Sequence, residues 1–263
     1  MLGGRADRWR RPTGVPTIVA GMSGDPTGRM ADLQRALDEM AEATDRLLAG
    51  LDRLTERDVR GPSLLPGWTR AHVLTHLARN ADGLAVLVHN ARTGDDRPMY
   101  PDDRDAAIQA GAGRGLGDLR LDLTDSAERL LEAFADFPAD GLDREVHLRS
   151  GASAYGWEIP VIRVREVEVH HVDLDAGYTP DDWSPEFAAR TLDQLAGFFH
   201  DNRDCPVGVL AATDAEGRWE VASAGPTLAG PRSALVGWLT GRTAGEGLTL
   251  DPPGEVPRAP RWS

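Results

Sequence analysis

The sequence predicts an α+β fold in which an amino-terminal four-helix bundle precedes a smaller α/β domain. Its 263 residues exceed one typical domain of ~100 to 200 residues, and a hydrophobic content of 41% supplies enough apolar surface for a core. Apolar residues recur every three or four positions in the first two thirds of the chain, whereas strand-like runs gather in the last third. We therefore expect a disordered extension over residues 1–29, the bundle over 30–180 and the α/β domain over 181–263.

The extension contains basic residues followed by a short apolar patch, Val15 to Met22. This patch is too short, and too interrupted by Gly and Pro, for the apolar region of a secretory signal. We interpret residues 1–29 either as disordered or as lying upstream of a true start at Met22 or Met30.

Four amphipathic helices are expected in the bundle. Thr69 is a suitable N-cap for the second helix, and Ile159 followed by Pro160 opens the fourth. A polar segment with a Gly-rich stretch separates the second helix from the third. A brief strand is expected near residues 145–149. The helices are expected over residues 30–54, 69–91, 119–134 and 161–175.

After Pro180 the pattern changes to that of a mixed α/β unit. An amphipathic helix precedes two strand-like runs joined by the turn Asp214–Gly217, which is typical of a hairpin. A strand-to-helix segment, a last short strand and a Pro-rich tail follow. These elements are expected over residues 185–200, 207–212, 218–222, 228–240, 248–250 and 252–263.

Composition excludes several classes of protein. Cys205 is the only cysteine, so neither an intrachain disulfide nor a cysteine-based zinc site is expected, and a reducing cytoplasm fits best. The net charge of −13 argues against a nucleic-acid partner, because phosphate binding needs clustered cations. All 29 basic residues are arginine, so fixed cationic contacts must come from guanidinium groups. No run of roughly 18 apolar residues could span a membrane.

The fourth predicted helix carries a candidate metal site. Glu166 and His170 stand four residues apart, about 6 Å along one helix face, so both can point at one ion. His76 on the second helix offers a third ligand. Two imidazoles and a carboxylate with one open position are typical of a catalytic zinc. The spacing alone also fits an exposed ion pair, although alternating valines and charges place polar groups on the interior side of this helix, where they need a partner or a metal.

Several strings resemble mycothiol-dependent maleylpyruvate isomerase, a family built on the DinB-like metal-binding four-helix bundle. They are LLPGWTRAHVLTHLARNADGL, RTGDDRPMYPDDR, RVREVEVHHVDL, the TGR that ends the late helix and the closing PRW. The resemblance runs in order from about residue 32 to the end. It implies metal ligands at His76, Glu166 and His170, the same three that the helix geometry selects.

The resemblance also assigns two arginines to the active site. It implies that Arg242 assists the reaction or binds the acidic substrate or the thiol, and that Arg104 lies near the same cleft. Both suit carboxylates, which guanidinium groups bind in a fork. His72 is a rival ligand one turn before His76, but its family counterpart is not a ligand. His171 points about 100° away from His170 and is expected to be structural.

Two further polar residues near the predicted ligands keep alternative roles. Asp173 could orient a ligand histidine or cap a neighbour, and Asn80, one turn beyond His76, is equally open.

The implied reaction is a mycothiol-dependent cis–trans isomerisation in aromatic catabolism. Mycothiol would add its sulfur to the double bond of maleylpyruvate, the adduct would rotate, and loss of the thiolate would give fumarylpyruvate. The expected cofactors are mycothiol and Zn²⁺, or another divalent metal, in a cytoplasmic protein for which a monomer is favoured. The alternatives are a metal-dependent transferase that conjugates mycothiol to another electrophile, and a non-catalytic metal- or ligand-binding module.

Overall fold

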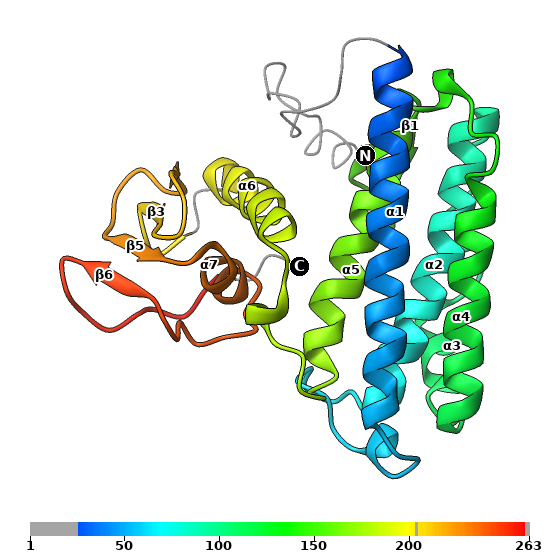
Figure 1. The fold of residues 1–263 in the computed structure, drawn as a ribbon, viewed down its shortest axis with the longest axis horizontal. Coiled ribbons are helices and arrows are strands. Elements are labelled where there is room, and N and C mark those ends of the chain that lie inside the picture. Colours follow the sequence, from blue (N-terminus) through cyan, green and yellow to red (C-terminus); the bar gives the residue numbers. More distant parts are fainter. Residues whose placement is uncertain (1–25, 203–204, 261–263) are drawn as a thin grey trace, which may run out of the picture. The chain divides into compact units, whose positions relative to one another are not determined.

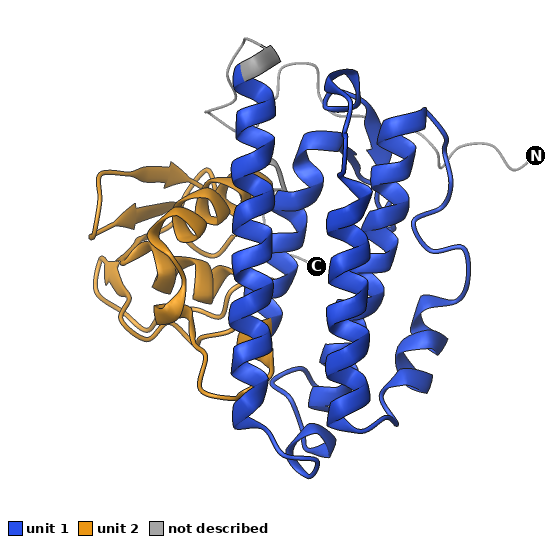
Figure 2. Ribbon diagram, turned by 45° about the vertical axis from the view of Figure 1, so that its right-hand side comes forward, with its two compact units in different colours: residues 1–170 blue, residues 171–263 orange. Residues whose placement is uncertain are grey.

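The computed structural model describes residues 26–202 and 205–260, which fall into two compact units (Figure 2). The first unit ends at His170 and the second begins at His171, so the division lies inside a helix. The mixture of a helical amino-terminal part and a smaller sheet-containing part confirms the predicted α+β class. Among the described residues, no helix combines the length and the hydropathy needed to cross a membrane.

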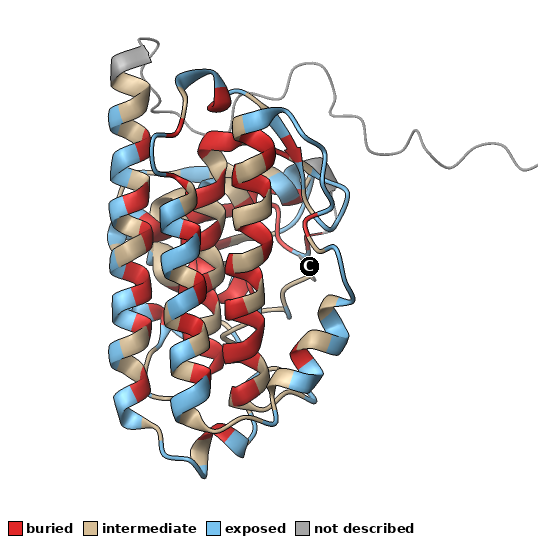
Figure 3. Cartoon of the chain, turned by 90° about the vertical axis from the view of Figure 1, so that its right-hand side faces the viewer, coloured by how far each residue is buried: buried red, intermediate tan, exposed pale blue. Residues whose placement is uncertain are grey.

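Long helices dominate the first unit (Figure 1). They are α1 (Pro26–Gly50), α2 (Arg70–Thr93), α4 (Leu116–Ala133) and α5 (Ile159–Asp173), the last of which continues into the second unit. Helix α2 packs mainly on α4 and is largely buried: 15 of its 24 residues are buried, whereas α4 buries four of its 18 (Figure 3). A side chain on the inner face of α2 is therefore shielded from water.

The first unit differs from the prediction at three points. Helix α1 begins at Pro26 rather than at Met30, while residues 1–25 of the predicted extension lie outside the described residues. A short helix, α3 (Arg104–Gly111), occupies the segment that was expected to be irregular, and the Asp103 carboxylate caps it. The expected strand β1 (Glu145–His147) pairs with an antiparallel strand that the sequence did not indicate, β2 (Ser153–Tyr155).

The second unit contains helices α6 (Pro185–Asn202) and α7 (Arg232–Leu239) and a four-stranded sheet in the order β4-β3-β5-β6. Strand β3 pairs antiparallel with β4 and parallel with β5, and β5 pairs antiparallel with β6. All six elements lie where the sequence predicted them, within three residues at each end. The strands are β3 (Val209–Ala212), β4 (Arg218–Glu220), β5 (Thr227–Gly230) and β6 (Thr249–Asp251).

Short 3-10 helices complete the secondary structure of the described residues. They cover Leu51–Arg53, Asp58–Arg60, Ala139–Gly141, Gly156–Glu158 and Pro180–Asp182.

Candidate metal centre

The start of α2 fixes the orientation of the helix that carries His76. Thr69 is the N-cap, as predicted, and its hydroxyl accepts a hydrogen bond from the backbone N–H of His72. The His72 ring in turn binds the capping residue, because its Nδ1 accepts a hydrogen bond of 3.2 Å from the backbone N–H of Thr69. Its Nε2 lies 3.2 Å from Gln109 Oε1 on α3. His72 is therefore a capping residue, and it is not a member of the cluster formed by the other predicted ligands.

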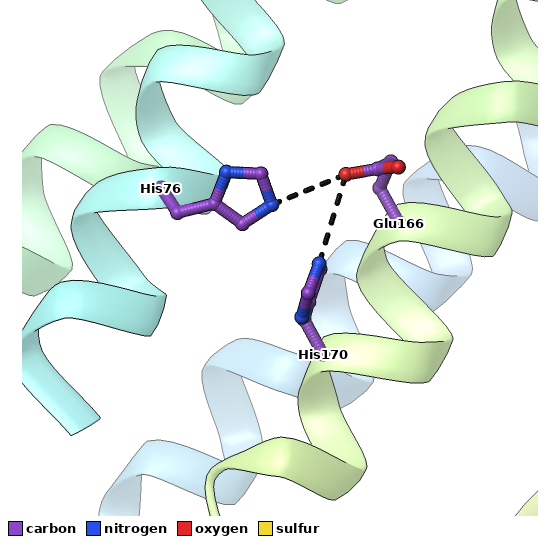
Figure 4. Close-up of side chains that lie close together, drawn as sticks. All are labelled: His76, Glu166 and His170. Atoms are coloured by element: carbon purple, nitrogen blue, oxygen red, sulfur yellow. Dashed lines mark hydrogen bonds and ion pairs between the residues drawn. The ribbon is translucent and has the colours of Figure 1, made fainter. Parts of the chain in front are cut away.

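His76, Glu166 and His170 come together between α2 and α5, as Figure 4 shows. Nε2 of His76 lies 3.2 Å from Oε2 of Glu166, and Nε2 of His170 lies 3.8 Å from the same oxygen. One candidate ligand atom from each residue lies within 4.8 Å of the other two. The structure thus brings together, in the first unit, the three side chains that the sequence singled out as metal ligands.

Arg104 determines which nitrogen of His76 carries the proton. Its Nη2 lies 2.6 Å from Nδ1 of His76, and because a guanidinium can only donate, Nδ1 must accept. The neutral ring then carries its proton on Nε2, which donates to Glu166. Burial is the main cause, and the nearby His170 the second, that lower the pKa of His76 from 6.5 to about 4. His76 is therefore neutral at physiological pH.

Glu166 is held in the ionised form. Burial raises its pKa, but the hydrogen bond from His76 and the electrostatic influence of the neighbouring His170 and Arg165 bring the pKa well below its usual range. About a quarter of the side chain, 24%, remains exposed, so solvent and small ions can reach the carboxylate. Metal binding requires a neutral imidazole and an ionised carboxylate, and at Nε2 of His76 it also requires the proton to move to Nδ1.

Buried charges hold α5 in place behind the cluster. The Arg163 side chain is fully enclosed, and its Nη1 donates to the backbone oxygen of Leu77 at 2.7 Å and to Oδ1 of Asn80 at 2.8 Å. Burial lowers the pKa of Arg163 to about 10, which still leaves it positively charged at neutral pH. On the other side, buried Glu168 accepts from Arg46 of α1 at 2.6 Å. Asn80 thus helps to position α5 against α2.

The predicted catalytic residue Arg242 lies in the second unit, where it forms a two-pronged ion pair with Asp173. Nε donates to Oδ1 at 3.1 Å and Nη2 to Oδ2 at 2.7 Å, while Nη1 donates to the backbone oxygen of Thr240. Asp173 is almost fully buried, with 1% of its side chain exposed, against 11% for Arg242. Asp173 therefore orients Arg242. His171 stacks on Tyr178, with ring centroids 3.8 Å apart.

Comparison with known proteins connects this geometry to one family. The family model for the mycothiol maleylpyruvate isomerase N-terminal domain matches residues 40–175, a little over half of the chain. The crystal structure of the mycothiol-dependent maleylpyruvate isomerase is similar with a TM-score of 0.81 and 29% identity, and a histidine-to-alanine mutant of that enzyme with 0.81 and 28%. Both alignments cover 88% of this chain and 97% of the other. A search of curated proteins gives no match. The chain belongs to the mycothiol maleylpyruvate isomerase family.

Proposed function

We propose that this protein is a metal-dependent and mycothiol-dependent isomerase that converts maleylpyruvate to fumarylpyruvate. The observation that carries the proposal is the cluster of His76, Glu166 and His170, whose spacing suits a divalent ion and which combines a neutral His76 with an ionised Glu166. The similarity to mycothiol-dependent maleylpyruvate isomerase over 88% of the chain supports the thiol and the substrate.

The three side chains fit a metal such as zinc. Ligand atoms about 2.1 Å from a tetrahedral zinc lie about 3.4 Å from one another. The observed separations of 3.2 and 3.8 Å from Glu166 Oε2 need only small side-chain adjustments to match. Two histidines and one carboxylate would leave one position open for a further ligand. Zinc is our first choice, although the same donors accept other first-row divalent ions.

In this proposal the protein acts through charge and position. When bound, the metal would stabilise the thiolate form of mycothiol at neutral pH. Maleylpyruvate would take up the thiolate at its cis double bond, rotate about the resulting single bond and release the thiolate, so that no atom is gained or lost. Arg104 and Arg242 would hold the carboxylates of the substrate. Among residues 26–202 and 205–260, the contacts of Arg242 with Asp173 and Thr240 engage one N–H of each terminal nitrogen.

The experiment is a spectrophotometric assay of the zinc-loaded protein with maleylpyruvate, with and without mycothiol. We expect conversion to fumarylpyruvate only with the thiol. His170→Ala should lose both stoichiometric zinc and activity, because it removes one of three ligands. The matched control His171→Phe, on the same helix, should keep both, since it retains an aromatic ring against Tyr178.

Each result bears on a different part of the proposal. Stoichiometric zinc in His170→Ala would refute the metal site. Full zinc content without any conversion of maleylpyruvate would refute the isomerase and favour transfer of mycothiol to another electrophile. Conversion without mycothiol would refute the thiol dependence.

A further inference from the structure

Arg163 of α5 is a buried cation that forms no ion pair within residues 26–202 and 205–260. Its Nη1 donates to two neutral oxygens of α2, the backbone oxygen of Leu77 at 2.7 Å and Oδ1 of Asn80 at 2.8 Å. In the same described ranges, its buried Nε and Nη2 contact no acceptor. Burial lowers the pKa of Arg163 to about 10, so the group is charged at neutral pH. Its charge is therefore neither paired with a carboxylate nor screened by water.

An arginine in these surroundings costs stability. Moving a charge from water into a protein interior is expensive, and neutral oxygens offset that cost less than a carboxylate would. An apolar side chain of similar volume could fill the space between α2 and α5 without the cost. The two hydrogen bonds to α2 therefore do not by themselves account for a guanidinium at this position, which points to a role for the charge itself.

The predicted metal ligands lie close to this charge. Glu166 follows Arg163 by three residues on α5, so the two side chains are neighbours on one helix face. Leu77, whose backbone oxygen Arg163 binds, directly follows the ligand His76. Burial has the largest effect on the pKa of Arg163, and the charge of Glu166 is the largest influence that opposes it. The positive charge of Arg163 thus acts on the site that would hold the metal.

Arg104, which contacts His76 at Nδ1, differs from Arg163 in its surroundings. It lines a surface cavity of about 460 Å³ that is bounded by residues 96–104 and 147–149. Its Nη1 forms an ion pair of 2.7 Å with the exposed carboxylate of Asp105. The charge of Arg104 is therefore offset by a carboxylate and partly screened by solvent, whereas the charge of Arg163 is not.

We propose that Arg163 sets the charge of the metal centre, so that the loaded site favours an anionic ligand at its open position. A divalent ion on two neutral imidazoles and one carboxylate leaves one positive charge, and Arg163 adds another nearby. This additional charge strengthens the binding of an anion and weakens the binding of the metal ion itself. The inference rests on the metal site of the proposed function, and it concerns a residue outside the predicted ligand set.

Asn80→Asp tests the charge while keeping the shape of the side chain. Aspartate keeps the oxygen that accepts from Arg163 and gives the guanidinium a carboxylate partner. Zinc affinity, measured by competition with a chelating dye, should rise about tenfold, because the positive charge near the ion is offset. Azide affinity of the Co²⁺-loaded protein, measured by visible absorption, should fall about tenfold. Arg163→Met, which removes the charge outright, should shift both affinities in the same directions.

The opposite signs of the two shifts separate charge from structure. A site that is merely loosened by a substitution would bind zinc and azide both more weakly. Arg163→Lys keeps the charge but loses the planar donor group, so any change that it causes should have the same sign for both ligands.

Asn90→Asp is the matched control, because it makes the same substitution at another buried position of α2, about 15 Å further along the helix axis. It removes the hydrogen bond from Nδ2 of Asn90 to the backbone oxygen of Arg97, so it also shows whether lower stability alone alters binding. We expect both affinities to stay unchanged.

Opposite shifts in Asn80→Asp, without such shifts in Asn90→Asp, would confirm the inference. Unchanged affinities in Asn80→Asp, or losses of both, would overturn it while the metal site stands. A wild type that binds no zinc would refute the metal site of the proposed function and this inference with it. Because neither assay uses mycothiol or maleylpyruvate, a failure of the isomerase activity has no bearing on the result.

Discussion

Acidification should destabilise the metal-free protein through His76. The neutral ring is buried beside His170 and its pKa is about 4, against 6.5 for an unperturbed histidine. Between these two values the unfolded chain binds a proton that the folded chain does not. The contribution of His76 to stability is therefore fully present above pH 6.5 and is lost as the pH falls toward 4.

The size of the effect follows from the same two pKa values. The stability difference relative to pH 7.5 should be about 2 kcal/mol at pH 5 and about 3 kcal/mol at pH 4. Glu166 contributes only at the lower end of this window, where the unfolded carboxyl, with a pKa of 4.5, takes up a proton that the folded carboxylate does not. A His76→Gln variant removes the titrating group and keeps a polar side chain of similar reach.

The assay is urea denaturation of the EDTA-treated wild type and of His76→Gln at several pH values from 7.5 to 4, followed by far-UV circular dichroism. Ionisable groups that do not contact His76 contribute equally to both proteins, so the difference between them reports on His76 and its partner Glu166. We expect the wild type to lose about 3 kcal/mol more than the variant by pH 4. A difference that does not change with pH would show that the ring is not held neutral, and the reasoning about the metal-free site would fail.

Three further substitutions test the frame around the site. Asp173→Asn should cost about 3 kcal/mol of stability, because it leaves the buried Arg242 charge without its partner; urea denaturation should show that adding Arg242→Met restores part of the loss. Gly156→Ala should cost about 3 kcal/mol in the same assay, since a Cβ would lie 2.2 Å from the backbone oxygen of Gly141. Gly117→Ala in α4, where a Cβ meets nothing within 4 Å, should instead raise the free energy of unfolding by about 0.5 kcal/mol. A higher thermal midpoint would report this stabilisation.

The long helices could be predicted because their signals are local. Apolar periodicity shows which residues face the core, and Thr69 indicates the start of α2 through its own side chain. Helix α3 has an N-cap in Asp103 but no apolar periodicity, because only Ile108 of its eight residues is buried. Strand β2 could not be predicted from the sequence either, because its three residues are too few to display an alternation of apolar and polar side chains.

The metal cluster could be predicted only in part from spacing. Glu166 and His170 share a helix face, so their separation of four residues is informative by itself. The third ligand lies on another helix, and the choice between His72 and His76 depended on the resemblance to the isomerase family. The structure supplies a physical reason for that choice, because the His72 ring is engaged in capping α2. A histidine in this capping position is not a pattern from which the role would be predicted.

The contact between Arg104 and His76 could not be predicted either, and it constrains how a metal can bind. Nδ1 of His76 now accepts from Arg104, so the proton lies on Nε2, the nitrogen that faces Glu166. A cation at Nε2 needs the lone pair of that nitrogen, and the proton would then move to Nδ1, where Arg104 has no acceptor to offer.

Metal binding at Nε2 and the present contact of Arg104 therefore exclude each other, and a loaded site would release the guanidinium toward the cavity that it already lines. Arg104→Met should consequently bind zinc at least as tightly as the wild type, measured by competition with a chelating dye, while KM for maleylpyruvate rises. A residue that merely supported the ligands would instead weaken zinc binding when removed.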